Sequence, residues 1–389
     1  MGNFEKETKL SKNASRKGQA FSSAIQVAEF DYATEVEEIG DIERNGYTFS
    51  DGCGLIKMST CKQIASEKFD SLHTYAFQIR MGGWKGVLVA CRDGFESDSP
   101  VKVKIRKSMK KFDHQPSDKK VELEVIRLAT YSCGYLNKQI IGILWSNGID
   151  AKIFLDMQEE YTKKILLFWD IDKFKVTEEY PFMLFSSIKF IDTKLYEAHK
   201  NNLNYFSDPF IGPLIKLVCY NKLKELRKRF RVFDEKCWVL IGVFDPYEWL
   251  EEGEVYIKRK VHKGRARGKG LKPDYISTPP LEGPVLVSRN PCVHNGDVRR
   301  LTAVVKKELE EYWNIIVFSS KGNRPAQDQM ACGDLDGDIY WINWREEFLD
   351  NFNEQPPNGA DKGLTKMLEE TKVEVPKVDK HWVNFLDTK

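Results

Sequence analysis

The sequence lacks the features that mark several common classes of protein. Its eight cysteines include no CxxC pair, and its six histidines add no zinc-finger spacing, so a structural zinc site is not expected. Cysteines spread in this way suit reduced thiols. No run approaches about 18 apolar residues, and the N-terminus has no apolar core of the signal-peptide type. We therefore expect an intracellular protein, cytoplasmic or nuclear, with no membrane partner.

The chain also has little net charge, +2 over 389 residues, so its overall electrostatics point to no particular partner. Local charge is more informative, because residues 258–272 hold eight Lys or Arg and no acidic residue. We predict a flexible basic loop here that can hold a phosphate polymer, although a plain solvated loop fits as well. The candidate contacts in this loop are Lys258, Arg259, Lys260, Lys263, Arg265 and Arg267.

The patterning of the chain predicts β-structure, then helices, then β-structure again. Short strand-like runs broken by glycine fill residues 47–113, and VKVKI at 101–105 alternates with period two. Helical patterns follow at 137–145, 151–168 and 211–231. Strand-like runs return after Cys237. The sequence thus predicts an α+β fold with a hydrophobic fraction, 41%, typical of a folded protein.

These shifts suggest five segments. We expect a flexible N-terminal lead-in, a first β-rich unit, a helical connector, a second β-rich unit and a C-terminal tail. Their boundaries are 1–44, 45–118, 119–232, 233–345 and 346–389.

The strongest local signal is the run Asp334-Leu335-Asp336-Gly337-Asp338, with three carboxylates in five residues. Each of these charges raises the cost of ionising the others, and a divalent cation offsets that cost. Alternate residues of an extended segment point the same way, and Gly337 allows a tight turn that returns Asp338 to the set. Ligands that are all anionic oxygens favour Mg²⁺.

Three other interpretations of this acidic cluster deserve comparison. An EF-hand needs glycine at loop position six and glutamate at twelve, where this chain has Ile339 and Arg345, so an EF-hand is excluded. An acidic surface turn fits poorly with the apolar run that follows at 339–342. The acid cluster of a hydrolase or nuclease stays open. Just upstream, Lys321 and Arg324 could neutralise phosphate or lie in a solvated loop.

At this point the residues resemble those of a known family. The segment 321–344, with KGNRP and GDLDGDIYWINW, resembles the signature of the eukaryotic RNA-dependent RNA polymerases of RNA silencing. Further blocks agree in the same order, and together they cover roughly residues 45–345. These blocks are SDGCGLIKMS, AFQIRMGGWKGVLV, SMKKF, LNKQII, DMQEE, GVFDPYEWLEEGEVYI and SRNPCVHNGDVR.

The resemblance implies two double-psi β-barrels joined by a helical connector. It places Asp334, Asp336 and Asp338 in the second barrel as catalytic, magnesium-binding residues. It also implies template-directed addition of NTPs to an RNA 3′-hydroxyl by a two-metal reaction, with a single-stranded RNA template and RNA-silencing proteins as partners. The cations that would face this site from the first barrel are Arg80, Lys85, Lys110 and Lys111.

Two features qualify what the resemblance implies. Members of the family are much longer than this chain, so a truncated, non-catalytic RNA-binding relative is the alternative. Two further groups are interpreted as structural rather than functional. Trp84 is expected to be a core or rim aromatic, and His294 and Asp297 are expected to lie in a structural loop whose Asn290 and Asp297 tie down backbone.

Overall fold

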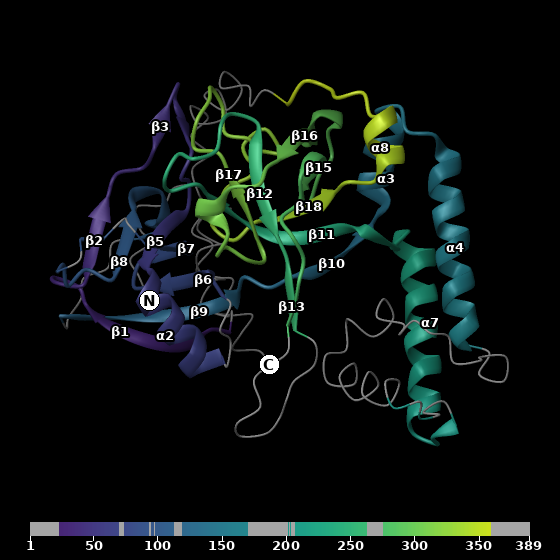
Figure 1. Cartoon of the computed structure of the whole chain (residues 1–389), viewed down its shortest axis with the longest axis horizontal. Coiled ribbons are helices and arrows are strands. Elements are labelled where there is room, and N and C mark those ends of the chain that lie inside the picture. Colours follow the sequence, from purple (N-terminus) through teal and green to yellow (C-terminus); the bar gives the residue numbers. More distant parts are fainter. Residues whose placement is uncertain are drawn as a thin grey trace, which may run out of the picture.

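The fold is mixed α+β and is built around two seven-stranded sheets (Figure 1). The computed structural model describes residues 23–69, 74–92, 95–96, 98–112, 119–169, 201, 203, 207–262 and 275–358. Elements of the N-terminal third form the first sheet, and elements after residue 131 form the second. No helix in these ranges is long and apolar enough to span a bilayer.

The first sheet is open at both edges. Its glycine-rich turn at Gly82 and Gly83 joins two antiparallel strands, with Gly82 at a φ of 54°. The helix α2 (Met58–Phe69) directly follows the strand Cys53–Lys57 and packs against it. In sheet order the strands are β1 (Ile25–Asp31), β9 (Lys120–Leu128), β6 (Ala76–Met81), β7 (Trp84–Cys91), β5 (Cys53–Lys57), β8 (Val103–Arg106) and β2 (Val36–Ile39).

Six strands of the second sheet form a closed ring, because the strand Val232–Phe244 pairs with a ring strand on each of its two edges. The strand β10 (Ser132–Leu136) is not part of the ring and pairs antiparallel with β11. The ring strands, in order, are β11 (Val232–Phe244), β17 (Ile315–Phe318), β12 (Glu254–Lys258), β16 (Val298–Ala303), β15 (Gly283–Arg289) and β18 (Ile339–Asn343).

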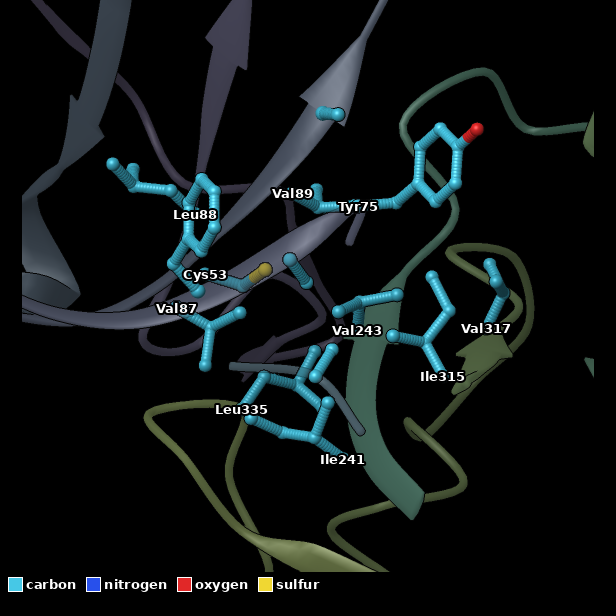
Figure 2. Packing of buried hydrophobic residues seen from close by; sticks show 14 of the residues in the cluster. Cys53, Tyr75, Val87, Leu88, Val89, Ile241, Val243, Ile315, Val317 and Leu335 are labelled. Carbon is cyan, nitrogen blue, oxygen red and sulfur yellow. The ribbon is translucent and has the colours of Figure 1, made fainter. Parts of the chain in front are cut away.

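One hydrophobic core runs through both sheets. Figure 2 shows Cys53 and Val87 of the first sheet facing Ile241 and Leu335 of the second half. All four side chains are buried. Close packing of this kind transmits displacement rather than absorbing it. The shared core therefore fixes the position of groups on one sheet relative to groups on the other.

Helices between β10 and β11 form a second core beside the ring. The first of them, α3 (Lys138–Ser146), begins at Asn137, whose side chain accepts hydrogen bonds from the backbone N–H groups of Gln139 and Ile140. The long helices α4 (Ala151–Trp169) and α7 (Ile211–Arg229) lie side by side (Figure 1). Short segments complete the fold: α8 (Glu346–Asn351), the hairpin β13 (Lys260–His262) with β14 (Tyr275–Ser277), and the pair β3 (Glu43–Arg44) with β4 (Tyr47–Thr48).

Several segment predictions need correction. The pattern predicts a flexible lead-in up to residue 44, yet β1 and β2 are strands of the first sheet. A register shift between Gln26 and Ala28 interrupts the alternation in β1, which conceals it. The predicted helical connector begins at 119, but β9 and β10 occupy its first part. The alternation VELEV in β9 buries Val121, Leu123 and Val125.

The basic segment also differs from the prediction at its start. A flexible loop is predicted from Lys258, but Lys258 is the last residue of β12 and is buried, with its Nζ 3.9 Å from the ring centroid of Trp313. The guanidinium of Arg259 packs against Tyr131 and Trp238, at 4.9 Å from each ring. Aromatic faces attract desolvated cations, which explains how these two can leave water. Lys263, Arg265 and Arg267 lie outside the described residues.

Candidate active site

The acidic run occupies a tight loop immediately before β18. The Asp334 backbone N–H donates to Asp338 Oδ2 at 3.1 Å, and the Asp336 N–H donates to Asp334 Oδ1 at 3.1 Å. Tyr340 donates its hydroxyl to the Asp334 carbonyl at 2.9 Å. Leu335 points into the shared core and is fully buried. Burial of Leu335 and these local bonds hold the three aspartates at the junction of the two sheets.

Two lysines of the first half reach this loop. Lys85 Nζ lies 3.1 Å from Asp336 Oδ1 and 3.0 Å from Asp336 Oδ2, and Lys111 Nζ lies 3.6 Å from Asp336 Oδ2. Gln78 Nε2 donates to the Asp336 carbonyl at 3.3 Å. These contacts join residues more than 220 positions apart in the sequence. The structure therefore brings two of the predicted phosphate contacts to one catalytic candidate.

The loop at residues 50–53 packs directly under Asp336. Leu335 donates its backbone N–H to the Asp51 carbonyl at 2.8 Å. Gly52 has a φ of +78°, and a Cβ at this position would lie 2.6 Å from the Asp336 Cβ. Only glycine tolerates both that backbone conformation and that approach. The glycine of the SDGCG block is thus required by contact with the acidic loop.

Arg289, at the end of β15, is a site residue that the sequence analysis missed. Its Nε donates to Asp338 Oδ2 at 2.5 Å and its Nη2 donates to Asp338 Oδ1 at 3.3 Å. A third bond runs from Nη1 to the Ala331 carbonyl at 3.2 Å. The two-pronged geometry is the one by which arginine fixes a carboxylate. The only signal for this role was the place of Arg289 in the SRNP block.

Electrostatics at the loop centre on Asp334. Burial raises the pKa of this carboxyl to about 7, and the neighbouring carboxylates of Asp336 and Asp338 act in the same direction. Burial also raises the pKa of Asp51, which lies beneath the loop. The protein cations contact Asp336 and Asp338, whereas Asp334 has no such contact among the described residues. Negative charge on Asp334 is therefore poorly compensated by the protein itself.

The donor set at the loop fits a hard divalent ion in its chemistry. It supplies carboxylate oxygens only, and Asp334 carries charge that a cation would stabilise. The side chains do not converge, however: the part of the chain that the structure describes contains no three acidic, histidine or cysteine side chains grouped as metal ligands. Asp336 is turned toward Lys85 and Asp338 toward Arg289.

The other predicted phosphate contacts lie in different surroundings. Arg80 pairs with Lys85 across β6 and β7, so both side chains leave the same face of the sheet. Lys110 Nζ lies 5.9 Å from the ring centroid of Trp84. Lys321 is paired with Glu251 at 2.7 Å, and Arg324 with Asp328 at 2.5 Å. The structure thus gives Lys321 and Arg324 partners outside the acidic loop.

The structural interpretations of Trp84 and Asp297 are confirmed. Trp84 is buried, and its ring stacks on Tyr32 with centroids 5.5 Å apart. Asp297 is buried and ties down backbone: its Oδ2 accepts from the N–H groups of Val293 and His294 at 2.9 and 2.8 Å. Its Oδ1 accepts from the Ala331 N–H at 3.1 Å, three residues before the acidic loop.

Replacing Asp297 with alanine is expected to lower the free energy of unfolding by about 2 kcal/mol, because three backbone N–H groups lose their buried acceptor. Ala331 and Cys332 hold φ values near +50°, which this anchor helps to maintain. Urea unfolding of the two proteins checks the loss. Asp350→Asn, at an exposed aspartate of α8, is the control and should change stability little. An Asp297→Ala protein as stable as the original would contradict the anchoring role.

Comparisons with known proteins point to one family. The model of the family described as RNA dependent RNA polymerase matches residues 1–389. The chain is 31% identical to RNA-dependent RNA polymerase 2 of Arabidopsis thaliana over an alignment of 404 positions, which covers 99% of this chain and 34% of that protein. It is 28% identical to RNA-dependent RNA polymerase 1 of Schizosaccharomyces pombe over an alignment of 373 positions, which covers 92% of this chain and 29% of that protein.

A solved structure shares the fold. The chain superimposes on RNA dependent RNA polymerase QDE-1 from Thielavia terrestris with a TM-score of 0.68 at 21% identity, covering 88% of this chain and 39% of that one. The chain spans about a third of the length of the curated relatives it matches. Because the family model matches it from end to end, the chain belongs to the RNA-dependent RNA polymerase family.

Proposed function

We propose that this chain carries the catalytic core of a template-directed RNA polymerase. It would copy a single-stranded RNA template by adding NTPs to an RNA 3′-hydroxyl, and the product would be double-stranded RNA for RNA silencing. The observation that carries the proposal is the contact of Asp336, in the loop before β18, with Lys85 and Lys111 of the first half. Carboxylates beside lysines suit a reaction among phosphates, where both charge signs must be positioned.

In the reaction, the 3′-hydroxyl oxygen attacks the α-phosphorus of an NTP, the bond to the β-phosphate breaks, and pyrophosphate leaves. Lys85 and Lys111 are placed to neutralise the phosphate oxygens as this charge moves. Gln78 and Gly52 hold the Asp336 backbone and side chain in place. Most of the rate enhancement in such a transfer comes from positioning and charge stabilisation, so a preorganised junction is what the reaction requires.

We propose Mg²⁺ as the cofactor, held by Asp334, Asp336 and Asp338. Bound magnesium would supply a lowered pKa for the attacking hydroxyl and charge stabilisation for the leaving phosphates, with the second ion of a two-metal site arriving with the nucleotide. Two cations of the protein would also lower the charge of the three carboxylates. Lys85 and Arg289 neutralise Asp336 and Asp338 in the arrangement described above, and they limit the repulsion among the three carboxylates.

We further propose a double-psi topology for the closed ring and for the half-barrel formed by the first sheet, with the helices α3, α4 and α7 as the connector between them. The closed six-stranded ring supports this topology for the second half. RNA-silencing proteins and an intracellular site, cytoplasmic or nuclear, complete the proposal. The main alternative is a non-catalytic, RNA-binding relative of these polymerases.

The test is one incubation of the full chain with a single-stranded RNA, a primer, labelled NTPs and Mg²⁺. Template-dependent extension is the expected result. Binding of the RNA without incorporation would replace the proposal with the non-catalytic alternative. Degradation of the RNA would instead indicate a nuclease. Omitting the template strand is the control, since untemplated addition of nucleotides would also overturn the proposal.

A further inference from the structure

We propose that the outer face of α7 is a second RNA-binding surface, remote from the acidic loop, that holds the phosphate backbone of long RNA. This inference rests on the proposed function for the identity of the polyanion. The surface, called here the α7 basic face, consists of Lys216, Tyr220, Lys224, Arg227 and Lys228. Spacings of four, four, three and one residues place all five on one side of the helix. All five are exposed.

The charge of α7 is unusually one-sided. Its only acidic residue is Glu225, which lies 3.8 Å from Arg231. Within the described ranges, no carboxylate lies within 4.0 Å of the four cations of the α7 basic face. Lys224 and Lys228 are separated by one helical turn, a spacing at which like charges repel. An external anion would relieve that repulsion, so the face is suited to bind phosphate.

The neighbouring helix α4 makes the contrast clear. Its Lys163 pairs with Glu159 at 2.7 Å, and its Lys164 pairs with Glu160 at 2.7 Å. Both pairs have the four-residue spacing that neutralises a helix surface within the helix itself. The two helices lie side by side (Figure 1). Among the described residues of the two helices, α7 therefore carries the excess of cations without a carboxylate partner, whereas α4 pairs two of its three lysines.

The chemistry of the face favours nucleic acid over a membrane. The apolar residues Ile215, Val218 and Leu226 of α7 are buried against the protein. Leu217 is exposed, but one leucine does not make the wide apolar face that a helix inserts into lipid. Tyr220 is 53% exposed among the cations, and Lys224 Nζ lies 6.0 Å from its ring centroid. An exposed aromatic ring among cations is what unpaired bases stack on, while the cations contact the backbone.

The position of α7 sets a length requirement for the RNA. The helix ends at Arg229 and β11 begins at Val232, and Gly242 of β11 donates its N–H to the Asp338 carbonyl at 3.2 Å. The ten steps from Val232 to Gly242 span at most about 33 Å. One nucleic-acid strand advances about 3.4 Å per nucleotide. At this duplex-like rise, an RNA strand needs up to about ten nucleotides to reach from the acidic loop to the end of α7.

The test compares two triple variants of the full chain by fluorescence anisotropy. One is Lys224→Gln, Arg227→Gln and Lys228→Gln on the α7 basic face. The matched control is Lys152→Gln, Lys163→Gln and Lys164→Gln on α4, which removes the same charge from the adjacent helix. The probes are single-stranded RNAs of 25 and 8 nucleotides. The assay contains no NTPs, so binding is read separately from polymerisation.

The α7 variant is expected to bind the 25-nucleotide RNA about tenfold more weakly, and its plot of log affinity against log salt should flatten by about 2, since each lost phosphate contact contributes about 0.7. The 8-nucleotide RNA and the α4 variant should show little change. Equal losses in both variants, or an equal loss for both RNAs, would overturn the proposal. The proposal would also be overturned if the α7 variant bound RNA as the original protein does but lost binding to vesicles of anionic lipid. Thermal unfolding verifies that both variants are folded.

Discussion

Asp336→Asn is expected to lower the initial rate of nucleotide incorporation by at least about a thousandfold. Among the three aspartates of the acidic loop, Asp336 is the one that Lys85 and Lys111 contact. Its amide replacement keeps the shape but removes the charge, so a divalent ion loses a ligand and Lys85 loses its carboxylate partner. A single preorganised electrostatic contact at a reacting centre is commonly worth a hundredfold to a thousandfold in rate, and this residue makes two such contributions. Primer extension with labelled NTPs measures the effect.

The matched control is Glu251→Gln. Glu251 pairs with Lys321 at 2.7 Å and is exposed, so the change also breaks one carboxylate–lysine pair of the second half, away from the acidic loop. Exposed pairs contribute about 1 kcal/mol or less, and the incorporation rate should stay within about twofold of the original. Incorporation by the Asp336→Asn protein at the original rate would remove Asp336 from the catalytic site. RNA binding by that variant shows that the protein is intact.

The acidic run and its turn could be predicted from the sequence, because both depend on residues that are close in the chain. The run 334–338 contains its three carboxylates within five positions, and the turn at Gly337 has a φ of +132° as the spacing predicts. The helices at 137–145 and 151–168 agree with α3 and α4 to within a residue or so at each end. Periodicity and capping are properties of a single segment, so they need no knowledge of packing.

What the sequence could not show depends on contacts between distant segments. Arg289 contacts Asp338 because β15 and β18 are neighbours in the ring, and their register is set by tertiary packing. Gln78 reaches Asp336 across the junction of the sheets for the same kind of reason. The buried position of Lys258 depends on Trp313, which lies 55 residues away. A basic run alone cannot reveal which of its members have aromatic partners.

The free energy of unfolding is expected to depend on pH through Asp334, because ionising this carboxyl destabilises the folded protein. Its pKa is about 7 in the folded protein, raised from an ordinary value of 3.8 by burial and then by Asp336 and Asp338. A carboxyl with a raised folded-state pKa stabilises the fold fully below 3.8, and that contribution is lost as pH rises through about 7. Between pH 5 and pH 8 the loss is about 3 kcal/mol, at 1.36 kcal/mol for each pH unit below the folded pKa.

Asp334→Asn separates this contribution from all other titrations. The amide has the shape of the protonated carboxyl and does not ionise, so the stability of the variant relative to the original should rise by about 3 kcal/mol from pH 5 to pH 8. Urea unfolding in the presence of a chelator, at each pH, measures the difference. Asp350→Asn, on the exposed surface of α8, is the control and should follow the pH profile of the original protein.

Adding Mg²⁺ supplies the decisive comparison, because a metal ion binds the deprotonated ligand and stabilises only the folded state. The ion should raise the stability of the original protein more at pH 8 than at pH 5, and it should do less for Asp334→Asn at either pH. Potassium chloride at matched ionic strength controls for screening. Parallel pH profiles for the original protein and Asp334→Asn would mean that the protein already compensates the charge of Asp334. In that case the Asp334 charge would give no reason for a divalent ion to bind.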